Sequence, residues 1–339
     1  MEQTLWVNMT IVRPIIMAAV DAGATLAEIC AAAGIDPALV SDPQARVTLE
    51  QRYAILAACE RSSGEPHLGL IAGQSASPMI LGLAGHLMET SATMRDALHG
   101  MVAFASTFSQ QISFRIEEDH GRFALVIEPT PLWEESSPGT VAMPVDLIMS
   151  SAVFLFKLLG GRHIRPLVAE FRREPPKDQD RFEETLRVRP TWRASRDRIV
   201  VSSADADLPV IGHNPELNLH FQRMLETQLA GIAQERGVRD EVRRVILQHF
   251  KFLLPSLTEV AKLLHVTPRT LQRKLAAEGT SFQRVADEVR HDLSKGMLAN
   301  QRLTVSEVAY KLGYAEPAAF QRAFKQWTGL TPKNYRAAL

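Results

Sequence analysis

Residues 256–330 contain two imperfect copies of one helical pattern, and this repeat constrains the fold more than any other part of the chain. Each copy begins with a hydroxyl residue and places a glutamate three positions later. This spacing is typical of a capping box, in which the two side chains pair with backbone N–H groups that have no partner at a helix start. The residues of the two boxes are Ser256, Glu259, Thr304 and Glu307.

After each box, about two turns of apolar helix lead into a short turn and a second helix. The second helices have proline at their first position, Pro268 and Pro317, where the missing N–H costs nothing. Each ends near a glycine, Gly279 and Gly329, as expected of a C-terminal cap. A helix, a tight turn and a second helix form a helix-turn-helix, whose second helix can enter the major groove of DNA.

A plain helical hairpin repeat without a ligand would show the same caps. The outward faces of the second helices favour DNA binding, because they carry Arg, Gln and Lys rather than mixtures of Glu and Lys. From Arg239 onward there are 17 basic and 9 acidic residues, whereas the preceding part has 21 basic and 29 acidic residues. This asymmetry indicates a nucleic-acid partner for the C-terminal part only.

Residues 239–336 resemble the arabinose-regulator (AraC/XylS) family of transcription factors. The most specific part of the match is residues 313–332, with the sequence GYAEPAAFQRAFKQWTGLTP. Two shorter segments, LQR at 271–273 and EGTSF at 278–282, match the first half of the family pattern. The first motif departs from that pattern at one turn, where His265 stands in place of the family's frequent glycine.

The resemblance implies an all-α DNA-binding domain over residues 238–339. Its helix-turn-helix motifs would lie at about 256–278 and 304–327. Residues 1–235 would form a separate α+β domain that binds an effector or dimerises. The expected hinge is at residues 237–238, because no long flexible linker is present. The predicted fold class is therefore an α+β N-terminal domain followed by an all-α domain with two helix-turn-helix motifs.

The helical spacing also predicts which residues of the second helices contact DNA. Leu271 and Leu275 face the core in the first motif, and Phe320 and Phe324 do so in the second. The remaining positions then face outward near the N-terminal half of each helix, where base edges are met. The predicted DNA-binding residues are Arg269, Thr270, Gln272, Arg273, Ala318, Gln321, Arg322 and Lys325.

These residue types differ in what they can recognise on DNA. Arginine suits the O6 and N7 atoms of guanine, and glutamine suits the N6 and N7 atoms of adenine. The family's base-reading positions correspond to Arg269, Gln272, Arg273, Gln321 and Arg322. A phosphate contact is the alternative for Arg273 and the expected role of Lys325. Since Ala318 can at most touch a thymine methyl, we expect weaker sequence discrimination from the second motif.

The first 235 residues change their apolar period part-way along the chain. Helical spacing dominates at first and predicts helices over 9–22, 25–33, 49–61, 66–74, 81–88 and 93–108. Alternation then predicts a β-hairpin with strands at 112–116 and 123–127. The remaining predicted elements are a central helix at 141–159, strands at 167–171 and 199–201, and helices at 182–186 and 214–234.

No pattern in the chain carries enzyme chemistry. It lacks a glycine-rich phosphate loop, a nucleophile elbow and a His-Glu-x-x-His motif, so we predict no catalytic residue, no cofactor and no enzyme activity. His213 and His220 could share a helix face, but no cysteine or second carboxylate accompanies them, which argues against a metal site. Cys30 and Cys59 are interpreted as small buried apolar residues.

The sequence also predicts a cytoplasmic protein without a membrane partner. No stretch reaches the ~18 apolar residues that cross a bilayer. Residues 147–156 form the most apolar run, and the flanking Asp146 and Lys157 favour a buried helix. The N-terminus has Glu2 ahead of its apolar residues and no basic region, so we predict no signal peptide.

The helical start and residues 66–70 (PHLGL) resemble the subgroup of the family with an arabinose-binding-like first domain. This resemblance implies a small-metabolite effector, and its default site would lie between the hairpin and the long helix. The alternative is a non-sensing dimeric DNA-binding protein whose first domain serves only for dimerisation. We expect a homodimer, an activator as the direction of regulation, and RNA polymerase as a further candidate partner.

The last helix of the first domain carries an apolar stripe with two interpretations. It could be a dimer seam or it could pack on its own domain, because four or five turns are short for a coiled coil. The residues of the stripe are Leu217, Phe221, Leu225 and Leu229.

Overall fold

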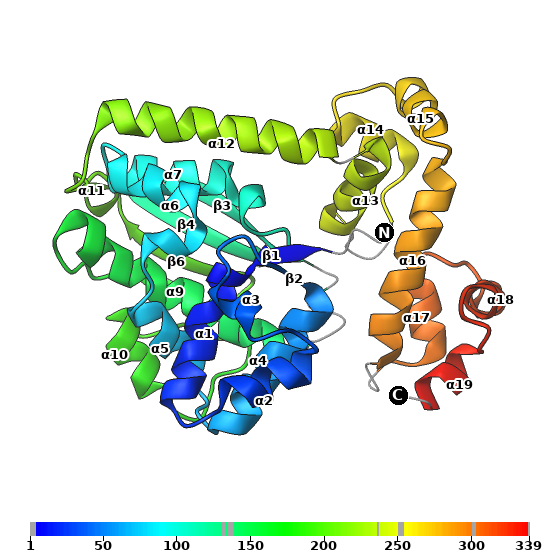
Figure 1. Cartoon of the computed structure of the whole chain (residues 1–339), viewed down its shortest axis with the longest axis horizontal. Helices are drawn as coiled ribbons and strands as arrows, with labels where there is room; N and C mark the ends of the chain where they lie inside the picture. Colours follow the sequence, from blue (N-terminus) through cyan, green and yellow to red (C-terminus); the bar gives the residue numbers. More distant parts are fainter. Residues whose placement is uncertain are drawn as a thin grey trace. The chain divides into compact units, whose positions relative to one another are not determined.

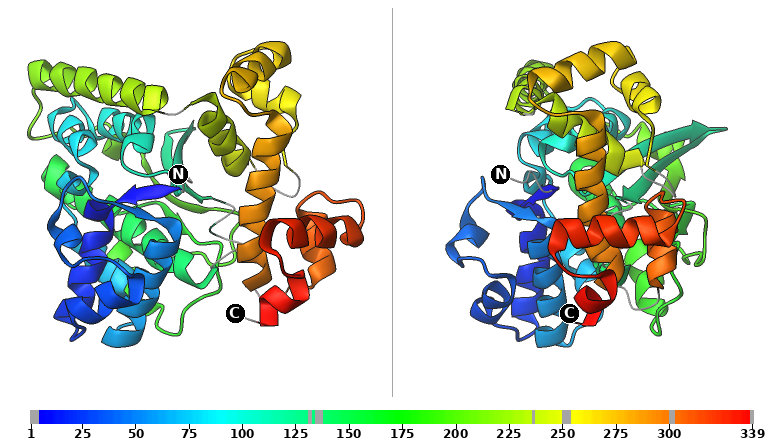
Figure 2. Two further views of the ribbon diagram at one scale, coloured as in Figure 1. Left: turned by 45° about the vertical axis from the view of Figure 1, so that its right-hand side comes forward. Right: turned by 90° about the vertical axis from the view of Figure 1, so that its right-hand side faces the viewer.

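The computed structural model describes residues 5–130, 133, 138–235, 237–249, 254–299 and 303–337. The chain divides into two compact units, drawn in Figures 1 and 2. The first consists of Met1–Pro129 and Gly139–Ala230, and the second of Thr130–Pro138 and Gly231–Leu339. Among the described residues, the first unit contains helices and two sheets and the second contains helices without strands, so the predicted fold class is confirmed.

The first unit begins with a group of short helices and a two-stranded sheet. Its strands are β1 (Trp6–Asn8) and β2 (Arg46–Thr48), which pair antiparallel with Val7 opposite Val47. Its early helices are α1 (Met9–Asp21), α2 (Leu26–Ala33), α3 (Ala38–Ser41), α4 (Leu49–Ser63), α5 (Leu68–Gln74), η1 (Pro78–Leu81), α6 (Leu83–Thr90), α7 (Met94–Ala103) and η2 (Ala105–Thr107). Its later helices are α9 (Pro138–Gly160), α10 (Asp180–Leu186), α11 (Ser203–Ala206) and α12 (Pro215–Glu235).

The larger sheet has the strand order β3-β4-β6-β5, and all neighbouring strands are antiparallel. Its strands are β3 (Ile112–Asp119), β4 (Arg122–Pro129), β5 (Val168–Glu170) and β6 (Asp197–Ser202). The predicted hairpin is confirmed, and Gly121 supplies the positive φ of 78° that its turn requires. Strand β4 is buried from Phe123 to Ile127 because it pairs on both edges and is covered on both faces.

Helix α9 lies at the centre of the first unit, as its apolar composition predicts. Side chains around its whole circumference are buried, including Val145, Met149 and Phe156. Within the described part of the chain, one helix, Thr140–Gly160, is long and apolar enough to cross a membrane by length and composition. More than half of the apolar stretch of this helix, 56%, is buried inside the structure. Its burial is that of a core helix.

One partly buried ion pair holds α9 to the segment after β5. The Arg173 guanidinium donates to Asp146 Oδ1 at 2.5 Å and also lies 5.3, 5.2 and 5.5 Å from the ring centroids of Phe171, Phe182 and Trp192. Burial raises the pKa of Asp146 to about 7, and the charge of Arg173 opposes that rise. The pair therefore fixes one face of α9 against an aromatic cluster.

Three details of the first domain differ from the sequence predictions. The three-residue strands β1 and β2 were missed. The helix predicted over 93–108 ends at Ala103, because Phe104 leaves the helical region, with φ −105° and ψ 13°, and the short 3₁₀ helix η2 follows. The helix predicted over 81–88 is divided at Gly82, whose φ of 61° and ψ of −131° lie outside the helical region.

The apolar stripe of α12 does not form one continuous exposed seam. Leu225 is fully buried, and the Phe221 ring stacks on His86 of α6 with centroids 5.0 Å apart. Leu217 is 47% exposed, and the neighbouring Leu219 and Met224 are exposed as well. The contact with His86 supports packing on the same domain for Phe221, and the homodimer stays a prediction.

The helices of the second unit are α13 (Val238–His249), α14 (Leu257–Leu263), α15 (Pro268–Ala277), α16 (Phe282–Ala299), α17 (Val305–Lys311), α18 (Pro317–Thr328) and α19 (Pro332–Ala337). The division into units falls at Ala230, inside α12, which continues without a break to Glu235. We therefore keep 1–235 and 238–339 as proposed domain boundaries.

Candidate functional site

The first helix-turn-helix begins at the capping box of α14. Ser256 N–H donates to Glu259 Oε2 at 2.7 Å, and Glu259 N–H donates to Ser256 Oγ at 3.3 Å. The hydrogen bonds from Ser256 lower the pKa of Glu259, because they stabilise its ionised form. Burial of Val260 and Ala261 then fixes α14 against the rest of the second unit.

The two turns between the motif helices have the same backbone geometry. Val266 N–H donates to the Ala261 carbonyl at 2.9 Å, and Tyr314 N–H donates to the Ala309 carbonyl at 3.0 Å. The residue before each of these donors is left-handed, at φ 53° for His265 and 81° for Gly313. His265 therefore occupies a left-handed position that favours glycine, which explains why the family often has glycine there.

Helix α15 presents one buried and one exposed face. Thr267 caps it by accepting from Thr270 N–H at 3.2 Å, and Leu271 and Leu275 are fully buried. The predicted DNA-binding residues Arg269, Gln272 and Arg273 are exposed. Thr270 is half-buried, and its hydroxyl lies 2.9 Å from that of Thr267, so the structure uses it at the helix start.

Helix α18 repeats this arrangement in the second motif. Phe320 and Phe324 are fully buried, and the Gly329 N–H caps the helix by donating to the Lys325 carbonyl at 2.9 Å. The exposed residues of this helix include the four predicted DNA-binding positions, Ala318, Gln321, Arg322 and Lys325. The phase predicted for both helices is therefore confirmed, and the DNA contacts themselves stay predictions.

Helix α16 connects the two motifs and separates their second helices. Figures 1 and 2 show α15 near one end of α16 and α18 near the other. Val285, Val289 and Leu293 are buried along one side of α16. A helix of 18 residues spans ~27 Å at ~1.5 Å per residue. This length approaches the ~34 Å between successive major grooves on one face of DNA.

Helix α13 is tied to α16 by two ion pairs. Arg239 Nη2 lies 2.7 Å from Glu288 Oε2, and Arg243 Nη2 lies 2.5 Å from Asp292 Oδ2. The start of α13 is held by Glu278, which follows α15 and accepts from the backbone N–H groups of residues 238 and 239 at 2.6 and 2.8 Å. A single carboxylate thus joins the expected hinge to the end of the first recognition helix.

We predict that Glu278→Ala lowers the free energy of unfolding of the second unit by about 1 kcal/mol, since two donors at the start of α13 lose their acceptor. Glu316→Ala is a matched control, because Glu316 precedes α18 without a side-chain capping bond. Urea unfolding measures the loss, and hydrogen exchange should locate it in residues 238–249. Equal losses for both variants would show that the Glu278 bonds do not stabilise α13.

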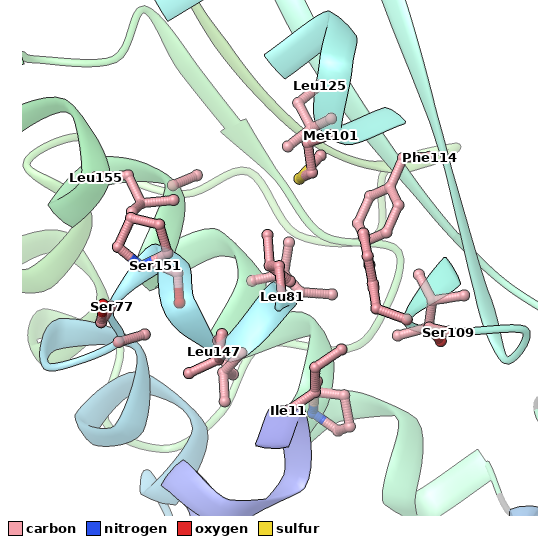
Figure 3. A pocket seen from close by; sticks show the side chains of 18 of the residues that line it. Ile11, Ser77, Leu81, Met101, Ser109, Phe114, Leu125, Leu147, Ser151 and Leu155 are labelled. Carbon is pink, nitrogen blue, oxygen red and sulfur yellow. The ribbon is translucent and has the colours of Figure 1, made fainter. Parts of the chain in front are cut away.

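The first unit contains a cavity of about 70 Å³, shown in Figure 3. It lies between the hairpin, through Phe114 and Leu125, and α9, through Leu147 and Leu155. Further walls come from α1, α4, α7 and the segment around η1. Its position agrees with the predicted location of an effector site, between the hairpin and the long helix.

Four lining residues of this cavity are polar, namely Arg52, Ser77, Ser109 and Ser151. The Arg52 guanidinium is buried and donates from Nη1 to Gln111 Oε1 at 2.9 Å. Burial lowers the pKa of Arg52 to about 9, so the side chain remains charged at neutral pH. The spacing of residues in the sequence predicts none of these lining residues, because it does not reveal where packing leaves a gap.

The described residues contain no group of three or more His, Cys, Asp or Glu side chains that could hold a metal ion. His213 precedes α12 rather than lying on it, and His220 is exposed on that helix. The two histidines therefore do not share a helix face. Cys30 and Cys59 are buried free thiols, as interpreted from the sequence.

Comparison with known proteins decides the family. Residues 23–210 match the model of the arabinose-binding domain of AraC transcription regulators, and residues 260–338 match a helix-turn-helix domain model. The chain belongs to the AraC family of transcription regulators. This AraC-family protein is a DNA-binding transcriptional regulator with an arabinose-binding-like N-terminal domain, as the sequence resemblance implied.

Relatives of this AraC-family protein match along most of their length. The Ornithine utilization regulator of Pseudomonas aeruginosa is 26% identical over 308 residues, 91% of this chain and 89% of that protein. The HTH-type transcriptional regulator VirS of Mycobacterium tuberculosis is 26% identical over 314 residues, 89% of this chain and 88% of its own. The crystal structure of transcriptional regulator CdpR from Pseudomonas aeruginosa covers 92% of this chain and 96% of its own, at 24% identity and a TM-score of 0.44.

Proposed function

We propose that this regulator reads operator DNA with α15 and α18 placed in successive major grooves. The observation that carries the proposal is the repeated geometry of the two motifs. Both have the same capping box, the same turn hydrogen bond and a second helix that buries one face and exposes Arg and Gln on the other. The basic charge of the segment from Arg239 onward supports attraction to the phosphate backbone.

The two helices would contribute unequally to sequence recognition. Arg269, Gln272 and Arg273 give α15 three exposed side chains able to pair with base edges. On α18 the corresponding face begins with Ala318, and Lys325 lies two turns further along, where the helix approaches the phosphates. We therefore propose that α15 supplies most of the discrimination between operator and random DNA.

We also propose that the first domain binds a small metabolite and that this changes DNA binding. The cavity between the hairpin and α9 supports the site, since effector pockets are typically concave and largely preformed. We further propose that the regulator is a cytoplasmic homodimer. It would activate its target promoter and contact RNA polymerase. A non-sensing regulator would instead bind its operator equally well with and without any metabolite.

Two substitutions separate base reading from phosphate contact. Loss of a base contact at Arg273→Ala should cost about 1–3 kcal/mol on the operator and much less on random DNA. Loss of a phosphate contact at Lys325→Ala should weaken both complexes equally and reduce the slope of log K against log salt concentration by about one. Fluorescence anisotropy at several salt concentrations measures both quantities, on an operator selected from a random-sequence pool.

The pattern across the two variants tests each assignment. If Arg273→Ala weakens binding to both DNAs equally, Arg273 contacts phosphate, and Arg269 and Gln272 are the remaining base-reading residues of α15. If neither variant changes binding to either DNA, α15 and α18 are not the recognition helices. Circular dichroism of each variant should match the unmodified protein, because both side chains are exposed.

A further inference from the structure

The cavity of the first unit has mostly apolar walls. All of its lining residues except Arg52, Ser77, Ser109 and Ser151 are apolar, and Figure 3 shows Leu81, Met101 and Leu147 around its interior. The volume of about 70 Å³ is several times the ~10–15 Å³ that one water molecule requires. The space is therefore large enough for a small organic molecule and poorly suited to a cluster of water.

Two of the three lining serines already accept hydrogen bonds from the backbone. Ser77 Oγ accepts from Met79 N–H at 3.2 Å at the start of η1, and Ser109 Oγ accepts from Gln111 N–H at 3.2 Å. Ser77 is also exposed, so it lies where the cavity meets the surface. Both hydroxyls therefore already have one hydrogen-bond partner in the protein.

Ser151 differs from the other two serines. It lies on α9, is only 8% exposed, and its Oγ has no hydrogen-bond partner among the described residues. A buried hydroxyl without a partner is costly, so a bound molecule that offered it an acceptor would remove that cost. The adjacent Ser150 is buried as well, but it donates to the Leu70 carbonyl at 2.9 Å.

We propose that this cavity binds a small, predominantly hydrophobic molecule with one hydrogen-bond acceptor, and that Ser151 donates to that acceptor. This inference rests on the proposed function, in which the first domain binds an effector, and it gives the chemical class of that effector. Sugars are excluded despite the name of the matching domain model, because most of their hydroxyls would face carbon. Each hydroxyl left without a partner lowers affinity by roughly tenfold or more.

Cyclic ketones provide a probe series with a single acceptor. Cyclopentanone, cyclohexanone and cycloheptanone differ by one methylene group each, and each added methylene should raise affinity by about fourfold until the cavity is filled. Isothermal titration calorimetry on the full chain, without DNA, measures the dissociation constants. Arabinose serves as the polyol probe. It should show no binding at concentrations at which cycloheptanone saturates the protein.

Adjacent substitutions on α9 identify the contact. Ser151→Ala should weaken cyclohexanone binding by about fivefold to tenfold, whereas cyclohexane, which has no acceptor, should bind both proteins equally. Ser150→Ala should leave ketone affinity unchanged, because Ser150 pairs with Leu70 and does not line the cavity. Ala152→Leu adds a larger side chain to the wall and should abolish binding of the whole series.

The outcomes distinguish this inference from the proposed function. Tight arabinose binding, or ketone binding that Ala152→Leu leaves intact, would overturn the assignment of the cavity. Equal losses of cyclohexanone affinity for Ser151→Ala and Ser150→Ala would overturn the role of Ser151 as the hydrogen-bond donor. DNA binding is measured separately by anisotropy with and without cyclohexanone. Ketone binding that leaves the operator affinity unchanged would support the ligand class and contradict the effector response.

Discussion

Gly69→Ala should lower the free energy of unfolding of the first unit by about 3 kcal/mol or more, an unusually large cost for one methyl group. A Cβ atom at Gly69 would overlap the carbonyl oxygen of Met143 and would lie 2.8 Å from the Cβ of Asp146. Both neighbours belong to α9, and one of them is backbone, so no side-chain rotation relieves the contact. Helix α5 would have to move away from the central helix.

A second glycine shows that this close approach extends along α5. A Cβ at Gly73 would lie 2.5 Å from the Leu147 carbonyl oxygen and 2.6 Å from the Cβ of Ser150. The two glycines are four residues apart and so occupy the same face of α5. Movement of α5 would also disturb the bond between Ser150 and Leu70, because Leu70 belongs to α5.

Gly231→Ala is the matched control for this prediction. Gly231 also lies in a helix, but a Cβ there would meet nothing within 4 Å. Alanine should therefore stabilise the protein by about 0.5–1 kcal/mol through helix propensity alone. Urea unfolding of the full chain, with hydrogen exchange to separate the two units, measures both changes. A neutral Gly69→Ala would mean that α5 and α9 are further apart than described.

The features that the sequence predicted well are local ones. The capping boxes at Ser256 and Thr304 depend on residues three apart, and both form with the predicted partners. The buried face of α15 follows from Leu271 and Leu275, which lie four residues apart, since helical spacing then assigns their neighbours to the other face.

The features that the sequence missed depend on distant residues. Strands β1 and β2 are three residues long and pair across about forty positions, too short for alternation to be recognised. The strand order β3-β4-β6-β5 and the identity of the residues that line the cavity likewise depend on which elements pack together. Ser151 could not be distinguished from Ser150 in the sequence, because the difference between them is which neighbour each hydroxyl meets.

Leu271→Ala should lower the free energy of unfolding of the second unit by about 2–5 kcal/mol. Leu271 is fully buried one turn into α15, so alanine would lose the transfer free energy of the removed atoms and leave a cavity. DNA binding should weaken only as the folded fraction falls. The ratio of operator to random-DNA affinity should therefore be unchanged under conditions where the variant is still folded.

The neighbouring residue provides the matched control. Gln272 is exposed on the same helix, so Gln272→Ala should change the free energy of unfolding by less than about 0.5 kcal/mol. It should also reduce the ratio of operator affinity to random-DNA affinity. Urea unfolding and anisotropy on both DNAs separate the two effects. If Leu271→Ala instead altered the affinity ratio at unchanged stability, Leu271 would contact DNA and the assignment of faces on α15 would be wrong. That result would also remove Arg269, Gln272 and Arg273 from the base-reading face, because all of them are assigned relative to Leu271.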